Sequence, residues 1–256
     1  MNILTVPTMV LRDTQPFFAQ VRLRERLGEL IGSLTGATVL FLALFGCLIG
    51  AFHGPLQALA SAIKLPLLYL LTLLITFPTL YVFNILFGAR FSMRQYFSLL
   101  LGATAINSVL LLGFAPIGIL FMLTSDSYLI FKLINILMLA ISGMVAMRFF
   151  YQGMGQIDEN AFPPPTADEG ELAEHNNQSD LQIPRSELKR QKSTRRRIMK
   201  LWVVLYALVG SQLAWTLKPF FGVPGKPFVL FDDKAGNFFI DVLESIAKLL
   251  FSTASY

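Results

Sequence analysis

Residues 34–52 read LTGATVLFLALFGCLIGAF, and this stretch decides the fold class because it contains no Asp, Glu, Lys or Arg. At a rise of about 1.5 Å per residue, a helix of this length covers about 28 Å, close to the roughly 30 Å hydrocarbon core of a bilayer. The turn signal His53-Gly54-Pro55 follows directly. We therefore predict that residues 34–52 form a first transmembrane helix.

Three similar apolar stretches follow the first, separated by short polar or basic connections. The second begins after Lys64 and ends near residue 87, and the next two cover residues 96–123 and 128–151. Pro78 and Pro116 are expected to kink the second and third helices, because proline removes a backbone donor and its ring clashes with the preceding turn. Small residues in the third stretch allow close helix packing, which predicts that it lies at the centre of the bundle.

A fifth apolar stretch, residues 201–217, is at the lower limit of about 17 residues for a crossing. Trp202 and Trp215 lie near its two ends, where interfacial tryptophans anchor membrane helices. Together with a four-helix unit over residues 34–151, it predicts an all-α, polytopic integral membrane bundle of about five transmembrane helices. A content of 54% hydrophobic and 14% charged residues, with a mean hydropathy of +0.60, agrees with a bilayer in place of a globular core.

Amphipathic segments are predicted at both ends of the chain. Residues 1–33 carry Phe17, Phe18 and Val21 among arginines at helical spacing, which favours a short cytoplasmic helix on the membrane surface, with a solvated arm as the alternative. Residues 218–256 form an aromatic tail that ends in a second amphipathic pattern. This pattern predicts an interfacial helix that rests on lipid or on a partner protein.

Residues 152–200 separate the fourth and fifth stretches and change sign along their length. Seven acids and no Lys or Arg lie in residues 152–184, whereas residues 185–200 are strongly basic. So few apolar residues cannot bury enough surface to offset chain entropy, which predicts a disordered or extended linker.

The distribution of charge predicts the orientation of the chain in the membrane. Its 21 basic and 16 acidic residues give a net charge of +5. By the positive-inside rule, the N-terminus, the hairpin with Arg90 and Arg94, and residues 152–200 face the cytoplasm, and residues 218–256 lie outside. The basic excess is thereby interpreted as a topological signal and not as a nucleic-acid site. A bacterial plasma membrane or a thylakoid is the expected location.

Motifs that carry catalysis or bind cofactors are not found in the sequence. It has no HExxH, Walker, GxGxxG or GxSxG pattern. The two histidines, His53 and His175, fall in a loop and in the linker, and Cys47 is the single cysteine. We therefore predict a protein that is not an enzyme, with no catalytic, cofactor-binding or metal-binding residues.

Four amide side chains lie inside the predicted spans: Asn84, Asn107, Asn135 and Gln212. Amides at membrane depth most often hydrogen-bond across helices and hold a bundle together, which is the favoured interpretation. The alternative is that Asn84, Asn107 and Asn135 line the path of a small passive or facilitative permease near the two prolines.

Aromatic and basic residues outside the spans are the predicted contacts with lipids or partners. A non-cytoplasmic tail so rich in phenylalanine exposes too much apolar area for water. The residues are Phe220, Phe221, Phe228, Phe238 and Phe239 in the tail, and Arg195, Arg196 and Arg197 in the basic run. The sequence favours a non-enzymatic scaffold or accessory subunit, which contacts membrane lipids and other integral membrane proteins in a larger complex or a homo-oligomer.

In topology, residues 34–151 resemble the Yip family of small five-span membrane proteins, with a cytoplasmic N-terminus and compact, short-looped spans. The resemblance implies a role in membrane organisation and partner recruitment. The chain departs from the family in the acidic-basic linker and in the aromatic tail, and no family motif is matched residue by residue, so the resemblance assigns no site residues.

Overall fold

The computed structural model describes residues 12–86, 92–124, 128–159, 185–220, 227–231 and 236–252. Those residues contain seven helices and no strand. The helices are α2 (Thr14–Leu23), α3 (Leu27–Gly50), α4 (Pro55–Leu86), α5 (Met93–Thr124), α6 (Tyr128–Glu159), α8 (Arg185–Thr216) and α9 (Phe238–Ser252).

Four of these helices are long and apolar enough to cross a membrane: α3, α4, α5 and α6. The prediction of an all-helical membrane bundle is confirmed in this form. The fifth span is not among the four, because its apolar residues are the short second half of α8, whose first half is basic. A count of five spans therefore stays a prediction.

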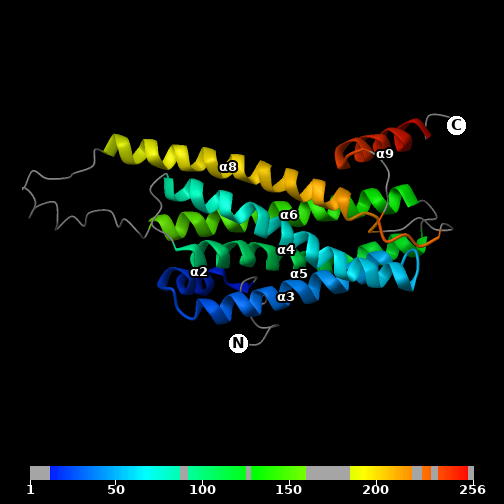
Figure 1. Ribbon diagram of the computed structural model, residues 1–256, viewed down its shortest axis with the longest axis horizontal. Helices are drawn as coiled ribbons and strands as arrows, with labels where there is room; N and C mark the ends of the chain where they lie inside the picture. The colour runs from blue at the N-terminus through cyan, green and yellow to red at the C-terminus, as the bar shows by residue number, and fades with distance from the viewer. Residues whose placement is uncertain are drawn as a thin grey trace, which may run out of the picture.

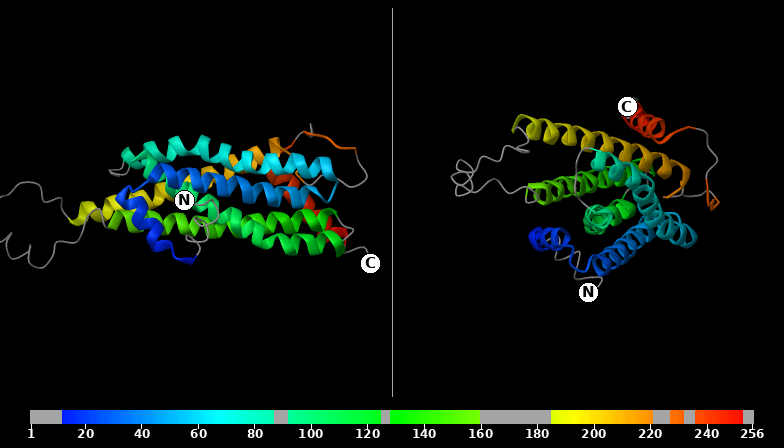
Figure 2. Two further views of the ribbon diagram at one scale, coloured as in Figure 1. Left: turned by 90° about the horizontal axis from the view of Figure 1, so that it is seen from below. Right: turned by 60° about the vertical axis from the view of Figure 1, so that its left-hand side comes forward.

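The long helices lie side by side along one axis, with α2 and α9 toward opposite ends (Figures 1 and 2). α5 packs against α2, α3, α4 and α6, which places it at the centre of the described bundle, as its small residues predict. α8 covers the outer side of α4. The prolines of the second and third membrane stretches do not end a helix. α4 continues through Pro66 and Pro78, and α5 continues through Pro116.

Two glycines one turn apart bring α3 and α4 into backbone contact. A Cβ atom at Gly50 would lie 2.5 Å from the carbonyl oxygen of Gln57 and 2.7 Å from the Cα atom of Ala58. A Cβ atom at Gly46 would lie 2.8 Å from the carbonyl carbon of Ser61. Such small-residue pairs, four positions apart, allow membrane helices to approach closely, so α3 and α4 form a tight hairpin.

The amphipathic helix α2 packs its apolar side on the bundle, and its position at the membrane surface stays a prediction. Phe17, Phe18 and Val21 are almost fully buried. The ring centroids of Phe17 and Phe18 lie 5.5 Å and 5.0 Å from that of Phe149 in α6. The reason is space: Gly102 and Gly153 lack the Cβ atoms that would meet these two rings at 2.6 Å. The apolar face of α2 is thus buried against other helices of the protein.

The helices on both sides of the acidic segment extend further than the sequence pattern predicts. α6 continues to Glu159, and α8 begins at Arg185 and continues into its apolar half without a break. Residues 160–184 lie outside the described residues. The basic run of residues 185–200 is helical, because the straight side chains of lysine and arginine favour helix as well as solvent.

Candidate functional site

A stripe of polar residues on α4 holds the segment that follows α8. Gln57, Ser61 and Lys64 are four and then three residues apart, which places them on one face of the helix. Each of them is no more than 4% exposed. Apolar helices surround this stripe, so its polar atoms need partners within the protein.

Those partners are main-chain carbonyl groups from the far end of the chain. Gln57 Nε2 donates to the carbonyl oxygen of Pro219 at 2.8 Å, and Ser61 Oγ donates to that of Phe220. Lys64 Nζ donates to the carbonyl oxygens of Leu230 and, at 3.4 Å, Pro219. Irregular chain leaves its carbonyl groups without a helix or sheet partner, and the α4 stripe supplies the missing donors.

A second attachment joins α9 to α6 through Lys132. Lys132 Nζ forms an ion pair with Asp241 and donates to Ser245 Oγ at 3.0 Å. Asp241 and Ser245 are one turn apart on α9, and Ser245 is buried. The structure thus gives this cationic side chain two protein partners on α9.

Asp241 and Ser245 of α9 face the bundle, and the apolar residues on the opposite side of the helix face outward. Phe239, Ile240, Leu243 and Ile246 are 40–66% exposed, and they share this outer side. Residues 228–231 in the preceding segment are also exposed. We call the exposed apolar residues of 228–231 and of α9 the outer tail face. It is a fixed surface, because Lys64 and Lys132 hold its two parts.

We expect Asp241→Asn to lower the local stability of α9 by about 1–3 kcal/mol, because the largely buried ammonium group of Lys132 loses its charged partner. Hydrogen exchange of the α9 amides measures this local opening. Glu244→Gln is the matched control, since the Glu244–Lys248 pair spans 3.8 Å on the exposed side and contributes at most about 0.5 kcal/mol. Equal losses of protection in both variants would contradict the attachment.

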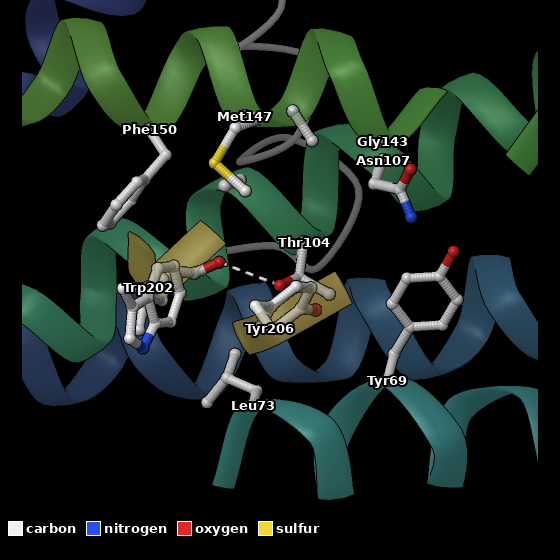
Figure 3. Close-up of a pocket in the computed structure, with 12 residues that line it drawn as sticks. Tyr69, Leu73, Thr104, Asn107, Gly143, Met147, Phe150, Trp202 and Tyr206 are labelled. Carbon is white, nitrogen blue, oxygen red and sulfur yellow. Dashed lines mark hydrogen bonds between the residues drawn. The ribbon is translucent and has the colours of Figure 1, made fainter. Parts of the chain in front are cut away.

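A cavity within the membrane region is a second candidate site (Figure 3). It lies between four helices and leaves about 60 Å³ for the centres of water-sized spheres. The lining residues are Tyr69 and Leu73 of α4, Leu100, Ala103, Thr104 and Asn107 of α5, Gly143, Ala146, Met147 and Phe150 of α6, and Trp202 and Tyr206 of α8. Most of this lining is apolar or aromatic.

Among the polar side chains of the cavity, Asn107 has the most hydrogen-bonding atoms without a partner. Its side chain is 2% exposed, and the Tyr69 hydroxyl interacts with it. Neither amide atom has another partner with good hydrogen-bond geometry. Thr104, by contrast, donates to the carbonyl oxygen of Leu100 at 2.9 Å. An unsatisfied buried polar group costs about 1–3 kcal/mol, so the Asn107 amide is an unusual feature for a purely structural position.

The other predicted amides do not join Asn107. Asn135 donates to the carbonyl oxygen of Phe131 in its own helix at 2.8 Å and faces Gly118. Gly118 and Asn107 are about 16 Å apart along α5 at about 1.5 Å per residue. Gln212 is exposed on α8, and the Asn84 side chain lies outside the described residues. Of the three described amides, Asn107 alone lines this cavity, and a permease path stays a prediction.

The predicted contact residues divide between exposed and partly buried positions. Phe228 and Phe239 are exposed, whereas Phe238 is half-buried and Phe220 packs against the core cluster that contains Leu42. Arg197 is exposed. Phe221 and the side chains of Arg195 and Arg196 lie outside the described residues. Two of the aromatic contacts thus belong to the outer tail face.

Trp202, next to the basic half of α8, is more deeply buried in protein than its predicted role as an interfacial anchor suggests. The sequence predicts an interfacial anchor, but the indole is 3% exposed and its Nε1 donates to the carbonyl oxygen of Thr76 at 3.0 Å. Its ring centroid lies 5.5 Å from that of Phe150 and 5.4 Å from that of Tyr206. Trp202 therefore fixes α8 to α4 and closes one end of the cavity.

Sequence reasoning missed the α4 stripe and the glycine pair in α3. The spacing of Gln57, Ser61 and Lys64 on one helical face, and the pattern of two glycines four positions apart, were the available signals. Within the described part of the chain, no group of three or more His, Cys, Asp or Glu could hold a metal ion. Comparisons with protein-family models, curated proteins and solved structures found no match to this chain.

Proposed function

We propose that this protein is a non-enzymatic scaffold or accessory subunit of a larger membrane assembly, and that another integral membrane protein binds its outer tail face. The observation that carries the proposal is the orientation of α9, whose Asp241 and Ser245 face the bundle while Phe239 and Leu243 face outward.

The attachment of this surface favours a protein over lipid as its occupant. Fluid lipid covers an apolar face in any orientation, so it gives no reason for Lys64 and Lys132 to fix the tail. A protein partner requires a surface of defined shape, since shape complementarity and preorganisation determine affinity. The contacts of Lys64 and Lys132 hold the outer tail face in one defined shape near the outer ends of α4 and α6.

The proposal includes the topology predicted by the charges. The N-terminus and the basic half of α8 face the cytoplasm, the apolar half of α8 crosses the membrane, and the tail lies outside. A bacterial plasma membrane or a thylakoid is the proposed location. Four uncharged or weakly charged membrane-length helices support the membrane part of this assignment.

A photoreactive amino acid at position 243 tests the proposal in the native membrane. We expect a discrete protein adduct from position 243 and none from position 137, which replaces an equally exposed leucine on α6. The Leu243→Gln variant should leave the particle without its companion and with its own fold intact, as measured by native mass after gentle extraction. Adducts to lipid alone at both positions, with a bare monomer after extraction, would reject a protein partner.

A further inference from the structure

The cavity of Figure 3 is lined by residues of α4, α5, α6 and α8 and is not fully enclosed. α4 packs against α8, and α5 packs against α6, but α6 and α8 are not closely packed on one another in the described residues. Phe150 and Trp202 bridge them at one end. At Gly143, further along α6, an added Cβ atom would meet nothing within 4 Å. The sparse packing of α6 on α8 and the free space at Gly143 indicate that the open side of the cavity lies there.

The size of the cavity corresponds to one six-membered ring. About 60 Å³ for sphere centres holds about four to six waters, since each water needs roughly 10–15 Å³ by that measure. At roughly 30 Å³ of liquid volume each, this is about 120–180 Å³, the range of an apolar protein cavity that binds benzene. The space is therefore large enough for one six-membered ring.

The lining specifies the chemistry of that ring. Phe150, Trp202, Tyr69 and Tyr206 offer aromatic surfaces, which stack on other rings. The Trp202 indole N–H is already used by Thr76. Asn107 has two N–H donors and one acceptor oxygen, of which the single Tyr69 hydroxyl cannot satisfy all. A ligand that bears a carbonyl or hydroxyl group on its ring would complete the hydrogen bonds of this amide.

We propose that the cavity binds the ring of a lipid-soluble quinone or phenol, whose oxygen pairs with Asn107 and whose apolar chain leaves between α6 and α8 beside Gly143. The ligand reaches the site from the bilayer, so no aqueous entrance is needed. The inference stands on the cavity alone and does not depend on a partner at the outer tail face.

The test uses the full chain in lipid nanodiscs that contain no quinone, with decylubiquinone as the probe. Trp202 lines the cavity, so a bound ring quenches its fluorescence in a saturable way. We expect Asn107→Leu to weaken binding about ten-fold or more, because leucine keeps the size of the side chain and removes its hydrogen bonds. Gln212→Leu removes an exposed amide of α8 outside the cavity and should leave the affinity unchanged.

A second variant keeps the test decisive if Asn107→Leu does not fold. Gly143→Leu places a large side chain in the cavity from α6 while the Asn107 amide itself is unchanged, and it should abolish saturable quenching while the fold persists, as judged by size-exclusion elution. Saturable quenching of equal strength in wild type, Asn107→Leu and Gly143→Leu would overturn the proposal. Quenching that rises only linearly with the probe concentration in the wild type would also overturn the proposal. That result is expected if the probe only partitions into lipid and water fills the cavity.

Discussion

Gly46→Leu is expected to separate α3 from α4 and to remove the monodisperse protein from detergent extracts. Even the Cβ atom of a side chain at this position would meet the backbone of Ser61, and backbone cannot move aside as a side chain can. Overpacking of a packed core typically costs about 1–3 kcal/mol, and the cost is at the upper end or above it where backbone must shift. Size-exclusion profiles and thermal unfolding in detergent measure the loss.

Gly32→Leu is the control for the same chemical change in the same helix. A Cβ atom at Gly32 would meet nothing within 4 Å, and leucine favours helix over glycine by about 0.8 kcal/mol. Gly32→Leu should therefore be as stable as the wild type or more stable. Equal unfolding temperatures for the two leucine variants would contradict the backbone contact between α3 and α4 at Gly46.

Phe17→Ala is expected to release α2 from the bundle and to destabilise the protein by about 3–5 kcal/mol. The ring is fully buried between Gly102 and Phe149, and its removal leaves a cavity that the surrounding helices fill only in part. Denaturant titration in detergent measures the free energy of unfolding, and proteolysis within residues 12–26 reports whether α2 has detached.

Phe83→Ala provides the comparison for Phe17→Ala. Phe83 is a phenylalanine in α4 that is 42% exposed, so its truncation creates no enclosed cavity. Its effect should be within about 0.5 kcal/mol, as for ordinary surface changes. A large loss in both variants would indicate a general requirement for aromatic residues, and α2 would then be an interfacial helix as its sequence pattern suggests.

The membrane-length helices could be predicted from the sequence because hydropathy alone determines them. Residues 34–52 contain no charge, and a helix is the structure that satisfies every backbone group within lipid. The central place of α5 could also be predicted, since small residues mark close packing. The span of α8 is harder to assign, because its short apolar half joins a basic half in one helix.

The sites depend on contacts between residues far apart in the chain, and the sequence does not specify these. Lys64 and Lys132 look like ordinary cations at helix ends until Leu230 and Asp241 are placed beside them. Phe17 and Phe18 satisfy an amphipathic pattern that serves lipid and protein equally. Asn107 is distinguished from Asn135 only by the cavity, which four helices form together.

The attachment of the tail by Lys64 and Lys132 has a consequence for biosynthesis. A ribosome completes α4 and α6 well before it translates Pro219, Leu230 and Asp241, so both lysines enter the membrane without their partners. A nascent chain that is released before these residues are made keeps two unpaired ammonium groups on membrane helices, an unfavourable and recognisable state. A chain that ends before Leu230 and Asp241 is therefore expected to be less stable in the membrane than the full chain, because both lysines lose these partners.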